Sequence, residues 1–200
     1  MNSRFTEKFS SHWIKVKFYQ KDPCLDKAVY PENIRFCEAV KMAVTRPVVL
    51  SKENLSCESA QYVFGWKDKI DAKLLDGCQD KCKISDKNLK SLLSEVPRFE
   101  KPFSHIGLNT VGEPDLLMAF VSPQDMMKII KVYNGHTGKN VDVSLNSMMG
   151  LCGNIAANAF LREKLAVSFG CLDSRKYAEI GRDRLVVGIP RKLFKVFVND

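Results

Sequence analysis

The sequence predicts an α+β fold (or a mixed α/β arrangement), with one domain over residues 1–200 and a mixed β-sheet packed against about six helices. Segments with strand periodicity and segments with helix periodicity alternate along the whole chain. Several connections between them are too short for regular βαβ crossovers, which disfavours a doubly wound parallel sheet. The composition, with 45% hydrophobic and 27% charged residues, is typical of a globular chain of this length.

The strands are predicted from period-two alternation and from short apolar runs. The first, at residues 12–18, alternates apolar and polar side chains, as a half-buried strand does. The run at residues 115–121 is continuously apolar, which indicates a strand buried on both faces. The predicted strands cover residues 12–18, 47–50, 115–121, 141–145, 167–170 and 184–189.

The helices are predicted from apolar residues at three- and four-residue spacing and from start and stop signals. Ser122 with Pro123 starts one helix, and Gly65 and Pro97 end two others. The predicted helices cover residues 31–44, 57–64, 86–96, 123–133, 148–161 and 191–198. Residues 67–84 mix charges of both signs and are expected to form a surface excursion with some helix, and residues 97–112 are expected to form loops.

The charge and the hydropathy pattern limit the class of protein. The net charge is +8, but the densest basic zone, within residues 67–90, is interleaved with aspartates, so we do not expect a nucleic-acid partner. No apolar stretch is long enough to cross a membrane, and residues 1–17 contain no continuous apolar segment typical of a secretory signal. We therefore expect a cytoplasmic protein without a membrane partner.

The seven cysteines are the most unusual feature of the composition. Their odd number and wide spacing do not match a secreted disulfide framework, so we expect reduced thiols. Seven thiols exceed what core packing needs, which raises the expectation of metal or thiol chemistry. The cysteines are Cys24, Cys37, Cys57, Cys78, Cys82, Cys152 and Cys171.

The common nucleotide-binding and hydrolase motifs are absent from the sequence. The three histidines, His12, His105 and His136, are too scattered to nominate a general base or a zinc finger. Cys78 and Cys82 form a C-x-x-x-C pair, which is a secondary candidate for half of a metal site or for a redox pair. The alternative is that both are semi-exposed thiols in a variable loop.

Cys37, Cys57, Cys152 and Cys171 are the main candidates for a functional site. Three of them lie in or at the start of predicted helices, and Cys152 and Cys171 have a glycine neighbour. A thiol at a helix N-terminus has a lowered pKa, and thiolates are soft metal ligands as well as nucleophiles. The four could hold an iron–sulfur cluster, or zinc as the alternative metal; otherwise all four pack in the core.

Arg175 is the candidate for anion or ligand binding in the charged stretch that follows Cys171. Its guanidinium could bind a carboxylate or a phosphate through two parallel hydrogen bonds. The alternative is an internal ion pair, for example with Asp183.

Several segments resemble an uncharacterised prokaryotic family called domain of unknown function 169. They are Phe36-Cys37-Glu38-Ala39-Val40, the stretch CESAQYVFG that begins at Cys57, Cys152 in its Asn- and Ala-rich surroundings, and Cys171-x-x-Ser174-Arg175 followed by Ile189-Pro190. The resemblance spans about residues 10 to 198. It implies occurrence in anaerobic archaea and bacteria, and it selects the same four cysteines and Arg175, but it implies no activity.

Three hypotheses of function follow from the sequence. The first is a protein that binds an iron–sulfur cluster, or another metal, through the four thiolates and serves a redox partner or builds a ligand site. The second is a thiol-dependent enzyme in which a low-pKa cysteine, Cys57 or Cys171, acts beside Arg175. The third is a protein that binds a small molecule or a tetrapyrrole cofactor among methionine and aromatic side chains. Oligomerisation remains open in all three.

Overall fold

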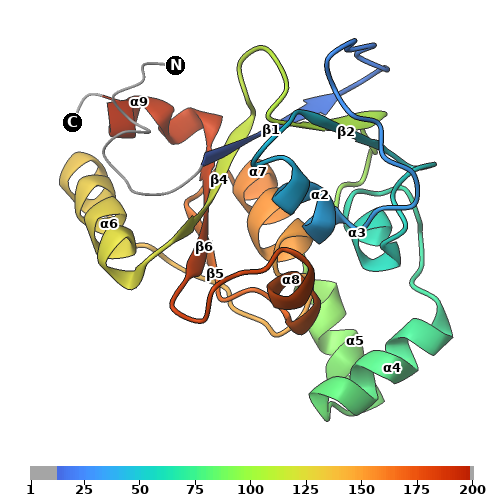
Figure 1. Ribbon diagram of the computed structural model, residues 1–200. Coiled ribbons are helices and arrows are strands. Elements are labelled where there is room, and N and C mark those ends of the chain that lie inside the picture. Colours follow the sequence, from blue (N-terminus) through green and yellow to red (C-terminus); the bar gives the residue numbers. More distant parts are fainter. Residues whose placement is uncertain (1–12, 199–200) are drawn as a thin grey trace.

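The computed structural model describes residues 13–198, apart from some side chains of one helix, α4, and that of Val198. A six-stranded sheet runs through it in the spatial order β2-β3-β1-β4-β6-β5 (Figure 1). The strands are β1 (Trp13–Tyr19), β2 (Val48–Ser51), β3 (His105–Leu108), β4 (Leu116–Val121), β5 (Ala166–Ser168) and β6 (Leu185–Pro190).

The described helices follow the predicted alternation with strands. They are α2 (Phe36–Met42), α3 (Glu58–Val63), α4 (Ala72–Cys82), α5 (Asp86–Glu95), α6 (Pro123–Thr137), α7 (Asn158–Arg162), α8 (Leu172–Tyr177) and α9 (Phe194–Val198), with a π-helix η1 (Cys152–Ala157) and a 3-10 turn η2 (Arg191–Leu193). The predicted α+β class is confirmed. All ladders between the six strands are antiparallel, however, and parallel pairing within residues 13–198 occurs only at two isolated bridges, not in a mixed sheet.

Side chains of successive strand residues enter two separate hydrophobic cores, one on each face of the sheet. In β4, Leu116 and Met118 belong to the larger core, while Leu117 and Ala119 belong to the smaller one. This alternation is the period of two that a strand imposes. Because both faces are covered, β4 is apolar throughout, as the sequence indicated.

Different helices cover the two faces (Figure 1). Helices α6 and α9 lie on the smaller core, to which α6 contributes Met126 and Ile129. The larger core receives side chains from α2, α3, α5, η1 and α7. Helices α4 and α5, which include much of the predicted surface excursion, lie together at one end of the molecule. Within residues 13–198, no helix combines the length and the apolar composition that crossing a bilayer requires.

One predicted loop and one predicted strand are wrong. Strand β3 lies in a segment expected to be loop, and the prediction missed it because Gly107 interrupts the strand pattern. A glycine is required there, since a Cβ would come within 2.8 Å of the Tyr19 ring and closer still to Thr110. Residues 141–145, expected to be a strand, have no sheet partner and form no regular element; Val141 packs against the smaller core. His12, the expected first residue of β1, lies outside the described residues.

Helix boundaries also differ from those predicted. Helix α2 begins at Phe36, not at Pro31, because Ile34 makes a parallel bridge to Leu55 that holds the preceding residues extended. Its start is capped by Glu38, whose carboxylate accepts the Arg35 N–H at 2.9 Å. The predicted helix over residues 148–161 is in fact η1 followed by α7. Helix α8 was not predicted.

Phe18 joins the central strand β1 to an aromatic group in the larger core. Its ring centroid lies 4.7 Å from that of Phe160, 5.0 Å from Phe103 and 5.1 Å from Phe99. Aromatic rings in stacked, tilted and edge-on contact at these distances stabilise a core beyond the area that they bury.

We expect Phe18→Ala to lower the free energy of unfolding by about 3–5 kcal/mol, because it leaves a cavity among these rings. The measurement is equilibrium unfolding in urea. Phe169→Ala, which removes a side chain that is 55% exposed, is the matched control and should change stability by less than about 0.5 kcal/mol. Equal effects of the two substitutions would contradict this assignment of the core.

Candidate functional site

Cys37, Cys57, Cys152 and Cys171 all line one pocket with a volume of about 320 Å³. Each of the four is a free thiol, and they come from four different segments of the chain. Cys37 and Cys152 are buried, and Cys57 and Cys171 are partly exposed. The fold therefore brings together the four cysteines that the sequence selected.

Each of these cysteines lies at the beginning of a helix. Cys57 and Cys171 are the residues that cap α3 and α8, Cys37 is the second residue of α2, and Cys152 is the first residue of η1. Helix α2 packs against α8, and α3 packs against η1. The pocket thus lies where the starts of two packed pairs of helices meet.

Gly150 fixes the approach of η1 to α8. A Cβ at this position would lie 2.4 Å from the Cys171 backbone nitrogen and 2.7 Å from Gly170 backbone atoms, which are contacts that backbone cannot relieve. Gly170 itself has a φ of +78°, a conformation that favours glycine. Gly150 and Gly170 therefore permit direct backbone contact between the segments that carry Cys152 and Cys171.

The Cys171 thiol is held by a reciprocal cap with the buried Ser174. The Ser174 backbone N–H donates to Cys171 Sγ at 3.4 Å, and the Cys171 N–H donates to Ser174 Oγ at 2.7 Å. Such an arrangement orients the sulfur and supplies it with a backbone donor. The sequence contained this signal as a cysteine three residues before a serine.

Cys152 begins a π-helix, which is rare and recurs at functional sites. The backbone N–H groups of both Gly153 and Asn154 donate to the Met149 carbonyl oxygen at 2.9 Å. The buried Asn154 amide also donates to the carbonyl oxygens of Asn146 and Met148 at 3.2 Å. Asn154 therefore holds the segment before η1 against the pocket, a role that sequence reasoning missed.

Burial raises the pKa of the Cys37 and Cys152 thiols well above the ordinary value, and it also raises the pKa of the Cys57 thiol. The other cysteines of the pocket raise it further, because each thiolate would repel the next. The expectation that Cys57 is a low-pKa thiol is wrong: the Ala60 backbone N–H lowers its pKa, but desolvation has the larger effect. In the metal-free protein these three thiols are protonated at neutral pH.

Arg35 places a positive charge close enough to act on two pocket thiols, and sequence reasoning missed it. It acts to lower the pKa of both Cys37 and Cys57. Its guanidinium lies 3.5 Å from a carboxylate oxygen of Asp173, which lines the pocket, and 4.5 Å from the centre of the Tyr177 ring. The available signal was its position two residues before Cys37.

Arg175 does not line the pocket. Its guanidinium donates to the backbone carbonyl oxygens of Gly181 and Arg184, both at 3.1 Å, and so ties the end of α8 to the turn before β6. The ion pair considered for it is absent among the described residues; Asp183 instead lies 3.8 Å from Arg184. Binding of an external anion by Arg175 stays a prediction.

Cys78 and Cys82 lie on α4, but their side chains are outside the described residues. Gly77, next to Cys78, lines the same pocket as the four cysteines. Across the described residues, no group of three or more His, Cys, Asp or Glu side chains is already arranged to hold a metal ion. The four thiols share a pocket, but they do not form a finished coordination site.

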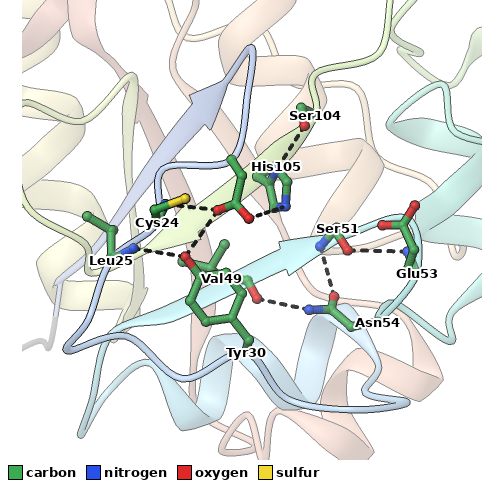
Figure 2. Close-up of polar contacts among 10 residues, drawn as sticks. Cys24, Leu25, Tyr30, Val49, Ser51, Glu53, Asn54, Ser104 and His105 are labelled. Atoms are coloured by element: carbon green, nitrogen blue, oxygen red, sulfur yellow. Dashed lines mark hydrogen bonds and ion pairs between the residues drawn. The ribbon is translucent and has the colours of Figure 1, made fainter.

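A second group of titratable side chains anchors the loop after β1 (Figure 2). Ser104 Oγ lies 2.8 Å from His105 Nδ1, and His105 Nε2 lies 3.8 Å from Asp22 Oδ2. Asp22 also accepts hydrogen bonds from the Cys24 N–H and the Tyr30 hydroxyl, and the first of these lowers its pKa. These contacts hold the loop after β1 in place. None of the residues in this network lines the cysteine pocket.

These observations define an antiparallel α+β protein with four free thiols converging on one pocket. A family model matches residues 7–200, and the chain belongs to that family, DUF169, described as uncharacterised ArCR. An uncharacterized protein of Methanocaldococcus jannaschii is 26% identical over 180 residues, which cover 84% of this chain and 76% of the relative. No solved structure matches the chain. The predicted family is confirmed, and it brings no established function.

Gly150→Ala should separate η1 from α8, because the added Cβ meets backbone atoms. We expect a loss of about 1–3 kcal/mol in the free energy of unfolding and faster alkylation of Cys152 in the native protein. Gly135→Ala on α6 is the control: nothing lies within 4 Å of its Cβ, and it should stabilise the helix by up to about 1 kcal/mol. Unchanged stability and thiol reactivity in Gly150→Ala would show that the contact is not required.

The raised pKa values predict that the metal-free protein loses stability in alkali. The unfolded thiols ionise above about pH 8.5, while the folded thiols remain protonated, so unfolding releases protons. At about pH 9.5, Cys37 and Cys152, which stay protonated in the folded protein, should each lower the free energy of unfolding by about 1.4 kcal/mol relative to neutral pH. Urea titrations with reductant and chelator, one at about pH 7 and one at about pH 9.5, measure the loss. A variant with alanine at Cys37, Cys57 and Cys152 should show a smaller one; an identical loss would refute the assignment.

Proposed function

We propose that Cys37, Cys57, Cys152 and Cys171 bind an iron–sulfur cluster, which serves electron transfer or builds a ligand site. The observation that carries the proposal is the convergence of these four thiols, from four segments, on one pocket. Four thiolates are the usual ligand set of [2Fe–2S] and [4Fe–4S] clusters. Zinc, which also takes four thiolates, is the alternative metal.

The chemistry of the pocket fits a soft, cationic occupant. Thiolates bind iron and zinc, and a bound cation removes the repulsion that raises the thiol pKa values in the metal-free protein. In other proteins, hydrogen bonds to the sulfur ligands shift the reduction potential of a bound cluster. The Ser174 backbone N–H supplies such a donor to Cys171. Arg35 would offset the negative charge of a cluster held by four thiolates.

Binding requires a local rearrangement, since the described thiols do not yet form a coordination site. Rotation of a cysteine side chain between staggered positions moves its sulfur without moving the backbone. Metal sites of this kind commonly become ordered when the metal binds, because the thiols lose their protons and acquire a shared partner only then. We therefore expect the sulfurs to turn inward on binding while the helix starts stay in place.

One observation favours a second function, the binding of a small molecule. Met148, Met149, Leu89 and Leu93 line the same pocket, and apolar linings of this size accept organic ligands. A tetrapyrrole or another apolar cofactor would use this lining without the thiols. The third hypothesis, a low-pKa catalytic thiol beside Arg175, is less well supported because the Cys57 pKa is raised and Arg175 lies outside the pocket.

Purification under strictly anaerobic conditions should give a coloured protein that contains iron and acid-labile sulfide in equal amounts. Replacing Cys37, Cys57, Cys152 or Cys171 by serine one at a time should remove most of both. Cys24→Ser is the control, because Cys24 is exposed and lies outside the pocket, and it should retain the full content.

Other outcomes separate the alternatives. Zinc without sulfide, lost in the same serine variants, would identify the zinc site instead of the cluster. A colourless protein with neither iron nor zinc would exclude the metal proposal, and saturable binding of an apolar cofactor to that protein would then favour the second function.

A further inference from the structure

A second pocket, with a volume of about 740 Å³, lies beside the smaller core, and we call it the basic pocket. The end of α6, the segment that follows it, the turn between α7 and β5, and η2 all line it. It shares no lining residue with the cysteine pocket, whose buried members Cys37, Cys152 and Met148 belong to the larger core on the other face of the sheet. The two pockets are therefore separate, and the volume of the basic pocket is in the range that holds organic ligands.

Positive charge predominates in the lining of the basic pocket. Four exposed cationic side chains line it against two carboxylates. Lys192 pairs with Glu163, but Lys139, Arg162 and Lys164 have no carboxylate partner among the residues that the structure describes. Helices α6 and α7 both end at this pocket, and each helix end contributes roughly half a negative charge. The two helix ends offset only part of the surplus, so the pocket remains positive.

The floor of the basic pocket carries a hydroxyl group that lacks a partner. Tyr133, on α6, lines the pocket and is only 9% exposed. Its hydroxyl is not sealed from solvent, and it makes no hydrogen bond to any residue within the described part of the chain. A buried phenol normally has a hydrogen-bond partner, so the partner of this one has to come from the pocket. Leu165, which is also buried, lines the same pocket and adds apolar surface beneath the exposed cations.

We propose that the basic pocket binds an organic diphosphate of the size of a nucleoside diphosphate. The unpartnered cations match the charge of a diphosphate: Arg162 can bind a phosphate through two parallel hydrogen bonds, and the lysines act on it as point charges. The Tyr133 hydroxyl and the apolar surface at Leu165 contact the organic part of the ligand. The net charge of +8 on the chain attracts an anion from a distance.

Glu163 competes with this ligand for Lys192. The Lys192 ammonium donates to the Glu163 carboxylate at 2.6 Å, and both side chains line the basic pocket. The two side chains are 66% and 57% exposed, so their ion pair adds little to the stability of the fold. A bound diphosphate replaces the carboxylate as the partner of Lys192. Removing the charge of Glu163 should therefore strengthen binding without unfolding the protein.

The experiment titrates the full chain with mant-ADP, a fluorescent nucleoside diphosphate, at low salt. The probe is then displaced with unlabelled ADP, adenosine, inorganic pyrophosphate or a single-stranded oligonucleotide. The variants are Arg162→Ser with Lys164→Ser, Tyr133→Phe, and Glu163→Gln. Lys101→Ser with Lys131→Ser is the control, because it removes the same charge from exposed positions outside both pockets. Unfolding in urea checks that every variant is folded.

ADP should displace the probe at a concentration about tenfold lower than adenosine or pyrophosphate requires, because each of those lacks one part of the contacts. Arg162→Ser with Lys164→Ser should weaken mant-ADP binding by about tenfold or more, and Tyr133→Phe by about threefold. Glu163→Gln should strengthen it by about twofold. The affinity of the unaltered protein should fall steeply when the salt concentration rises from about 0.05 M to about 0.5 M.

The absence of saturable binding up to about 1 mM mant-ADP would overturn the proposal, as would equal affinities of the Arg162 and Lys164 double variant and its control. If pyrophosphate displaces the probe as well as ADP does, the pocket takes free phosphates and the organic ligand is wrong. If the oligonucleotide displaces the probe at a lower concentration than ADP, the pocket is part of a nucleic-acid surface instead. Because the basic pocket shares no residue with the cysteine pocket, these outcomes are independent of the iron content.

Discussion

The backbones of Gly150 and Cys171 lie so close that no side chain fits between them, and the pocket depends on that contact. It holds the segment before η1 against the segment before α8. Since α2 packs on α8 and α3 packs on η1, the same contact sets the distance between the two helix pairs that carry the thiols. A wider approach here would separate Cys152 from Cys171 and open the pocket between them.

Two effects act in opposite directions on the thiols. Their positions at helix starts provide backbone N–H groups, which favour the thiolate, whereas burial and the neighbouring cysteines favour the neutral thiol. In the metal-free protein burial has the larger effect. A cation among the four sulfurs would reverse the balance, because it replaces the protons and compensates for the lost hydration. The same residues thus suit an inert reduced pocket and a charged coordination shell.

Local patterns in the sequence predicted most of the sheet and the choice of cysteines. Apolar runs and capping residues identified β4 and the start of α6, because those signals are carried by neighbouring residues. The prediction missed β3, where Gly107 interrupts the pattern, and it gave residues 141–145 a strand that finds no partner. Arg35 and Asn154 were missed because their roles depend on segments distant in sequence. The predicted lowering of the Cys57 pKa was wrong, because a position at the start of a helix does not indicate how deeply the thiol is buried.

The order of the four cysteines along the chain has a consequence for biogenesis. Cys37 and Cys57 belong to the first half, but the pocket is complete only when Cys171 and α8 dock against α2, late in the sequence. Contacts between such distant segments form slowly and cannot be made by a partial chain. A ligand that needs all four thiols could therefore bind only after the chain has been synthesised beyond α8. During that interval the early thiols lack their final burial and are open to oxidation, so a reducing environment protects the nascent chain as well as the finished fold.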